Sequence, residues 1–207
     1  MENLFHFKKS AVVAVFDFDH TLIRGDSLWP FLACLAGWPR AFAALTEAVF
    51  LFIIRYLKKD PATADRRTFI KARLLRRLLG GRNPNSLVAA IEKLQIWCAW
   101  NEPIRQKLLD HYGKGHRIVV ASGSLDLYLP ALLKELPAHD LICTEVEIKN
   151  GAVTGAMPAG NCVRARKADM LKTWLAANGP FEESWGYGNF PHDLPMLNLL
   201  DHRIIVS

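Results

Sequence analysis

The chain has 207 residues, of which 51% are hydrophobic and 22% are charged. This length and composition fit one medium-sized globular domain, or a core with an insertion, and exclude a disordered chain. The four cysteines are widely spaced and include no Cys-x-x-Cys pair, which argues against a zinc site and a disulfide framework. The formal net charge is +6. We expect a cytoplasmic protein, because the start of the chain lacks a signal-peptide pattern.

The first informative segment is the apolar run Val12–Phe16, which predicts a buried strand. Asp17 and Asp19 follow it directly, and Thr21 comes two residues later. Alternation along an extended chain would place Asp17 and Asp19 on one side and Phe18 on the other. Two carboxylates at the end of a buried strand are costly unless they are compensated, for example by a divalent cation such as Mg²⁺. The alternative is that Asp19 or Thr21 only caps a following helix.

Residues 26–111 have mostly helical character and contain the apolar stretch Ala41–Ile54. This stretch is shorter than the roughly 20 residues that cross a bilayer. It predicts a helix buried in a cap, or alternatively a membrane-surface contact. Residues 55–82 carry ten basic and two acidic side chains. Such a block attracts a phosphorylated substrate or an anionic membrane surface, or is only a solvated helix face. We expect no nucleic-acid partner, because no recognised binding motif accompanies the block.

The remainder of the chain alternates between apolar runs and helical patterns. A helix is expected from Ser124 to about Leu136 and another over Arg166–Ala177, and Asn150-Gly151 predicts a hairpin turn. The expected strands cover His116–Ala121, Leu141–Ile148, Trp185–Tyr187 and Arg203–Val206. This alternation predicts an α/β fold with a Rossmann-like parallel sheet and helices on both of its faces.

Three later segments add polar groups that complement Asp17 and Asp19. Ser122 and Gly123 follow a strand, where a hydroxyl and backbone N–H groups can hold an anion. Lys167 can neutralise a phosphoryl oxygen, and Asn189 and Asp193 are oxygen donors for a hard cation. These groups suit phosphoryl transfer, in which a carboxylate attacks phosphorus and a second carboxylic acid protonates the leaving group.

With these motifs in order, the chain resembles the haloacid dehalogenase superfamily, in its phosphoserine-phosphatase-like branch (subfamily IB type, helical C1 cap). The motifs are Asp-Phe-Asp-His-Thr at 17–21, Ser-Gly-Ser at 122–124, Lys167, and the segment 188–197. The resemblance implies a catalytic core formed by residues 1–25 and 112–207. It also implies an all-helical cap, residues 26–111, inserted after the first strand.

The resemblance also implies a role for each matched residue. Asp17 would be the nucleophile and a metal ligand, and Asp19 would be the general acid/base and offer its carbonyl to Mg²⁺. Lys167 would stabilise the charged intermediate. Thr21, Ser122 and Gly123 would contact the phosphoryl group, and Asn189 and Asp193 would complete the metal site.

One position departs from the family pattern, which usually has Asp where this chain has Asn189. The loss of a negative charge predicts weaker metal binding than in a relative with Asp. Asp26 lies at the mouth of the expected cap and would meet an ammonium or hydroxyl of the substrate, or else cap a helix. Arg73 or Arg76 would match a cap arginine that holds a substrate carboxylate.

The sequence therefore predicts a Mg²⁺-dependent phosphomonoesterase acting on a small phosphorylated metabolite. One alternative is a membrane-surface phospholipid head-group phosphatase, similar to a phosphatidylglycerophosphatase and peripheral to the inner face of a membrane. Another is a non-catalytic binding module that keeps the fold, for which Asn189 is the only support. The sequence identifies neither the substrate nor the oligomeric state.

Overall fold

The computed structural model describes residues 10–206 and contains a five-stranded parallel sheet in the order β3-β2-β1-β6-β7. Its strands are β1 (Val12–Phe16), β2 (Arg117–Leu125), β3 (Asp140–Thr144), β6 (Glu183–Asn189) and β7 (His202–Val206). A separate antiparallel hairpin joins β4 (Ile148–Lys149) to β5 (Ala152–Val153). The predicted α/β fold with a helical insertion after the first strand is confirmed.

The alternating side chains of the central strand β1 pack into two cores, one on each face of the sheet. Val13 and Val15 face helices α7 (Arg164–Asn178) and α8 (Leu194–Leu197). Ala14 and Phe16 belong to the larger core, which also includes residues of the inserted helices. Because both faces of β1 are buried, its continuous apolar sequence has the pattern expected of a central parallel strand.

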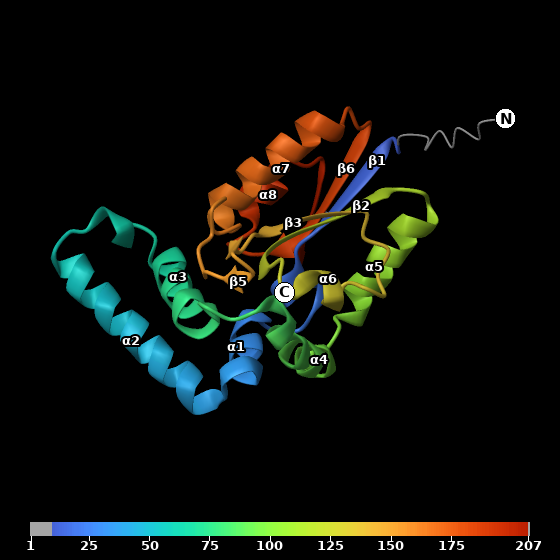
Figure 1. Ribbon diagram of the computed structural model, residues 1–207. Helices are drawn as coiled ribbons and strands as arrows, with labels where there is room; N and C mark the ends of the chain where they lie inside the picture. Colours follow the sequence, from blue (N-terminus) through green and yellow to red (C-terminus); the bar gives the residue numbers. More distant parts are fainter. Residues whose placement is uncertain (1–9, 207) are drawn as a thin grey trace.

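Four helices follow β1 and form the inserted cap (Figure 1). They are α1 (Leu28–Ala36), α2 (Trp38–Leu57), α3 (Arg66–Leu79) and α4 (Val88–Trp97), with short turns at Pro61–Thr63 and Pro84–Leu87. Gly37, with φ of 81°, separates α1 from α2. Asp65 begins α3 by accepting a hydrogen bond from the backbone N–H of Arg67 at 3.0 Å. In Figure 1, α3 lies between the sheet and α2, which forms the outer edge of the cap.

The expectation that Ala41–Ile54 lies buried in the cap is wrong. In α2 the fully buried side chains are only alanines, namely Ala41, Ala44 and Ala48. Helix α2 packs against α3 and α1, and several large apolar side chains of α2 are exposed. Within residues 10–206, no helix is long and apolar enough to cross a membrane.

Helix α5 (Glu102–Gly113) lies against the sheet (Figure 1). Its buried His111 contacts the hydroxyl of Tyr187 on β6, with 2.9 Å between Nε2 and the hydroxyl oxygen. The sequence predicts that the cap ends at residue 111, because helical character continues to that point. Because α5 packs on the core strands, we propose that the insertion ends before Glu102.

Two elements near β2 differ from the expected ones. Strand β2 continues to Leu125, four residues beyond the expected end, and α6 covers only Leu129–Leu132. The extension pairs Leu125 with Thr144 of β3 after a shift in register. The helix is short because residues 124 and 125 belong to β2, and residues 126–128 and 133–135 form turns on either side of it.

Candidate active site

The site begins where β1 ends, at Asp17, which is 3% exposed. The chain then forms one wide turn, Phe18–Leu22, that is not helical at Asp19 or at His20, where φ is 59°. This turn returns Thr21 towards the strand, and its hydroxyl donates a hydrogen bond to Oδ2 of Asp17 at 2.9 Å. Thr21 therefore orients the Asp17 carboxylate and is completely buried.

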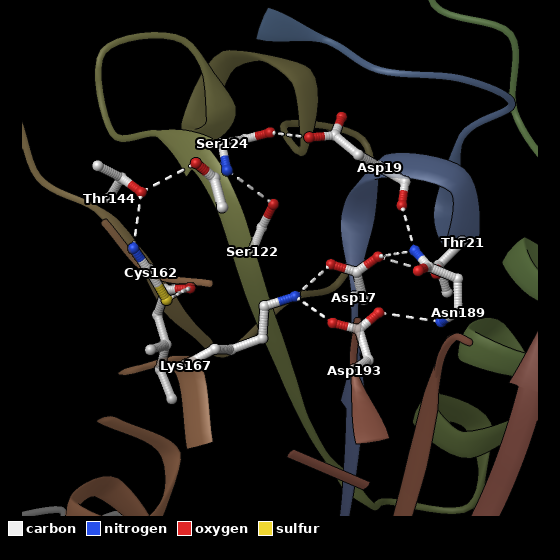
Figure 2. A network of polar contacts seen from close by, with 12 residues as sticks. Asp17, Asp19, Thr21, Ser122, Ser124, Thr144, Cys162, Lys167, Asn189 and Asp193 are labelled. Carbon is white, nitrogen blue, oxygen red and sulfur yellow. Dashed lines mark hydrogen bonds and ion pairs between the residues drawn. The ribbon is translucent and has the colours of Figure 1, made fainter. Parts of the chain in front are cut away.

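Lys167 connects the two buried carboxylates of the site (Figure 2). It comes from the first turn of α7, and its Nζ lies 2.7 Å from Oδ1 of Asp17 and 2.7 Å from Oδ1 of Asp193. Burial opposes the charge on Lys167, but the carboxylates of Asp17 and Asp193 outweigh it and hold the pKa of Lys167 above its ordinary value. A permanent cation therefore lies beside Asp17.

Asn189, at the end of β6, joins the first and last motifs. Its backbone N–H donates to Oδ2 of Asp193 at 2.9 Å. Its side-chain Nδ2 donates to the backbone carbonyl of Asp19 at 3.2 Å and lies 3.5 Å from Oδ2 of Asp17 (Figure 2). The side chain of Asn189 therefore faces the oxygens that the sequence predicts as metal ligands.

The carboxyl group of Asp19 is held by two donors. The hydroxyl of Ser124 donates to Oδ2 at 2.6 Å, and the backbone N–H of Ser27 donates to Oδ1 at 2.8 Å. Burial and, next, repulsion by the Asp26 carboxylate raise the pKa of Asp19 to about 7. A carboxyl group with this pKa can both give and take a proton near neutral pH.

These residues meet at a cavity of about 410 Å³. Among the predicted residues, its lining includes Asp17, Asp19, Asp26, Gly123, Lys167, Asn189 and Asp193. Thr21 and Ser122 are fully buried and lie behind this lining. The Ser122 hydroxyl accepts a hydrogen bond from the backbone N–H of Ser124 at 3.0 Å, so it stabilises the irregular end of β2 that contains Gly123.

The two substrate-binding predictions for the cap have different outcomes. Asp26 lines the cavity and also accepts a hydrogen bond from the backbone N–H of Trp29 at 3.0 Å, so both of its alternatives describe its position. Arg73 does not reach the cavity lining. Its guanidinium lies 5.7 Å from the centre of the Phe69 ring, because its position on α3 faces α2 and not the core.

The cavity also contains cap residues that sequence reasoning missed. Arg67 and Lys71 of α3 line it, as do Asn161, Arg164 and His192 of the core. Lys71 is 7% exposed, and its ammonium contacts the Gly123 carbonyl, Asn161 Oδ1 at 2.8 Å and Thr144 Oγ1 at 3.2 Å. Burial lowers the pKa of Lys71 to about 8. The sequence does not indicate that Lys71 is buried, because the residues around it are also basic.

The donor set suits a hard cation but is unusual in its composition. Within residues 10–206, no group of three or more His, Cys, Asp or Glu side chains is placed to hold a metal. The available ligands are the carboxylate of Asp17, the carbonyl of Asp19 and the Oδ1 of Asn189 once its amide turns to exchange Oδ1 for Nδ2, with Asp193 beside them. All of these ligands are oxygens, which fits Mg²⁺. Two of the three are uncharged, which predicts modest affinity.

Residues 14–198 match the model of a protein family described as haloacid dehalogenase-like hydrolases. The chain belongs to this family. The predicted resemblance to this haloacid dehalogenase-like family and to its phosphoserine-phosphatase-like branch is confirmed.

Two curated relatives of this haloacid dehalogenase-like chain are similar over most of it. Protein CicA of Caulobacter vibrioides is 24% identical over 200 residues, which cover 93% of this chain and 84% of that protein. Phosphoserine phosphatase SerB2 of Mycobacterium tuberculosis is 28% identical over 189 residues, which cover 88% of this chain but 41% of that protein.

Solved structures share the same fold. A protein of unknown function from Bordetella pertussis Tohama I has a TM-score of 0.74 at 22% identity, covering 95% of this chain and 90% of that one. A substrate-bound phosphoserine phosphatase has a TM-score of 0.62 at 16% identity, covering 96% and 86%. At these identities the likeness concerns the fold, and the chemistry rests on the side chains of this chain.

Proposed function

We propose that this protein hydrolyses a phosphomonoester through a covalent aspartyl-phosphate on Asp17, with Mg²⁺ as cofactor. The observation that carries the proposal is the pairing of Asp17 with the Lys167 ammonium at 2.7 Å, at a cavity that Asp19 also lines. A buried carboxylate that only stabilised the fold would not need a second carboxyl group with a pKa near 7 beside it.

In the first step a carboxylate oxygen of Asp17 attacks phosphorus and the bond from phosphorus to the ester oxygen breaks. Asp19, in its protonated form, gives its proton to the departing alkoxide, which leaves as an alcohol. The ammonium of Lys167 stabilises negative charge on the phosphoryl oxygens. When bound, Mg²⁺ supplies further neutralisation of that charge.

In the second step water attacks the phosphorus of the aspartyl-phosphate. Asp19, now a carboxylate, accepts the proton from this water, and the bond between phosphorus and Asp17 breaks. The products are inorganic phosphate and the original Asp17 carboxylate, and Asp19 is protonated for the next cycle. The hydrogen bonds from Ser124 and Ser27 keep the Asp19 carboxyl group in place through both steps.

The cavity lining combines the cations Arg67, Lys71, Arg164 and Lys167 with the carboxylates Asp17, Asp19, Asp26 and Asp193. The cations can bind the oxygens of a phosphorylated substrate. A small phosphorylated metabolite is the first candidate. A second candidate is a lipid phosphomonoester, favoured by a groove of about 520 Å³ between α2 and α3. This groove shares Leu28, Arg67 and Lys71 with the cavity and is lined mainly by apolar side chains.

The test is phosphate release from a panel of phosphomonoesters with and without Mg²⁺, for the wild type and Asp17→Asn. The panel contains phosphoserine, sugar phosphates, nucleotides, phosphocholine and phosphatidylglycerophosphate in micelles. We expect turnover that needs Mg²⁺ and is lost in Asp17→Asn. Acid-quenched wild-type protein should also carry one phosphoryl group on the peptide that contains Asp17.

Asp169→Asn is a matched control, because Asp169 is exposed on the same helix as Lys167 but does not line the cavity. Its turnover should equal that of the wild type. Activity retained in folded Asp17→Asn would contradict the assigned nucleophile. A folded wild type that releases no phosphate from any compound would favour the non-catalytic alternative.

A further inference from the structure

The outer face of α2 presents an unusual concentration of exposed apolar side chains. Exposed large apolar residues on this helix are Trp38, Phe42, Val49, Phe50, Ile53, Tyr56 and Leu57. Leu57 is 75% exposed and Phe50 is 61% exposed. Such a contiguous apolar surface on a protein marks an interaction site.

The spacing of these residues creates a stripe along one side of the helix. Trp38, Phe42, Val49, Ile53 and Tyr56 recur at intervals of three, four and seven residues, which place them on one helical face. Leu57, four residues after Ile53, borders the same face, and we call these six residues the α2 stripe. The buried alanines of α2 lie on a different side of the helix. Figure 1 shows α2 as the outermost helix of the cap.

Cationic side chains lie at both ends of α2. Arg40 is exposed near its first turn, and Lys58 and Lys59 are exposed directly after its last residue. The acidic side chains of this region are already engaged. Glu47 is paired with Arg77, Asp60 is paired with Arg55, and Asp65 caps α3. The exposed cations Arg40, Lys58 and Lys59 therefore lie near the two ends of the stripe.

The α2 stripe also adjoins the opening of the catalytic cavity. Val49 and Ile53 belong to both the stripe and the apolar groove between α2 and α3. The groove is bordered by Arg66 and Arg67, and Arg67 also lines the cavity. A partner that covered the stripe would thus lie next to the entrance of the site.

We propose that the cap docks on an anionic lipid bilayer through the α2 stripe, with α2 lying in the plane of the membrane interface. A long helix with an apolar face, basic flanks and interfacial aromatic residues has the properties of such an element. Trp38 and Tyr56, at the two ends of the stripe, are residue types enriched at membrane surfaces. A second copy of this chain is a poorer occupant, because a symmetric contact would bring the same basic side chains together.

Flotation with vesicles tests the proposal without any need for catalysis. The full chain is mixed at low salt with vesicles of equimolar phosphatidylcholine and phosphatidylglycerol, or with vesicles of phosphatidylcholine alone. We expect binding to the anionic vesicles, weakened by added salt, and much less binding to the neutral ones. Asp17→Asn should bind as the wild type does, which separates docking from the proposed enzymatic activity.

The double variant Ile53→Glu/Leu57→Glu should bind anionic vesicles at least roughly tenfold more weakly. Lys58→Gln/Lys59→Gln should bind roughly tenfold more weakly and respond less to salt. Ile96→Glu is the matched control, because Ile96 is 87% exposed on α4, outside the stripe. Its binding should not change. Circular dichroism and thermal melting confirm that every variant is folded.

Absence of wild-type binding at low salt would overturn the proposal, as would equal binding by wild type and Ile53→Glu/Leu57→Glu. The wild type could instead form a dimer without binding vesicles. Loss of that dimer in the double variant would assign the α2 stripe to a contact with a second copy of the chain.

Discussion

Gly188 leaves no room for a side chain, because Asp193 lies directly against its α carbon. A Cβ at Gly188 would be 2.7 Å from the Cβ of Asp193 and 3.0 Å from its Oδ2. The same Asp193 contacts Lys167 through Oδ1 and the backbone N–H of Asn189 through Oδ2. The position of Lys167, the residue that we propose stabilises the phosphoryl charge, therefore depends on a glycine that does not itself line the cavity.

Gly188→Ala is expected to reduce the turnover number by roughly 10–100-fold while the protein stays folded, because displacement of Asp193 moves Lys167. The measurement is steady-state phosphate release together with a thermal melt. Gly113→Ala is the control, since a Cβ there meets nothing within 4 Å. Equal activity in both alanine variants would show that the contact with Asp193 does not set the active geometry.

Lys71→Met should lower the free energy of unfolding by roughly 1–3 kcal/mol, because the acceptors on Gly123 and Asn161 lose a buried donor. It should also reduce activity, since Gly123 at the end of β2 lines the cavity. Arg73→Met, two positions further along α3, is the comparison and should retain activity, because Arg73 contacts Phe69 outside the cavity. Denaturant unfolding and phosphate release distinguish the two variants. The opposite ranking would restore Arg73 as the cap residue of the site.

Asn189→Asp should lower the Mg²⁺ concentration needed for half-maximal activity, because it adds a negative charge beside Asp17 and the Asp19 carbonyl. Titration calorimetry with Mg²⁺ provides a measurement that does not depend on turnover. An unchanged or weaker Mg²⁺ requirement would refute the idea that Asn189 limits metal affinity.

The lowered pKa of His111 predicts that the protein loses stability as the pH falls. Burial, aided by the charges of His116 and Lys114, lowers the pKa of His111 from 6.5 to about 4. Between these values the unfolded chain binds a proton that the folded chain does not. The free energy of unfolding therefore falls as the pH falls from 6.5 to about 4, by up to about 3 kcal/mol. In His111→Gln this dependence should be smaller in denaturant titrations across that range, and an identical slope would contradict the prediction.

Local sequence patterns predicted the core of the fold well. The run Val12–Phe16 coincides with β1, because a strand buried on both faces needs apolar residues at every position. The end of β2 and the location of α2 were not predictable in the same way. Pairing of Leu125 with Thr144 depends on a distant strand, and the exposure of Phe50 depends on which side of α2 meets α3. The hydrophobicity of a residue does not by itself predict whether another part of the fold buries its side chain.

The site was predictable where its groups follow strands in order. Asp17 and Asn189 meet because the parallel strands β1 and β6 bring their carboxyl ends to one edge of the sheet. Lys167 in the first turn of α7 and Asp193 at the start of α8 reach the same edge. Lys71 was missed because its neighbours in the chain are also basic, and only the packing of α3 on the core distinguishes it. The register of a helix in a cap is set by tertiary contacts, which a local pattern does not contain.

The link from Lys71 to Gly123, Thr144 and Asn161 has a consequence for protein engineering. The helical insertion is not an interchangeable module, because one of its side chains completes a polar cluster that the catalytic scaffold leaves open. A chimera that received a foreign insertion would inherit three acceptors without their donor. Successful grafting should therefore require either a lysine at the equivalent position of the donor helix or compensating changes at Thr144 and Asn161.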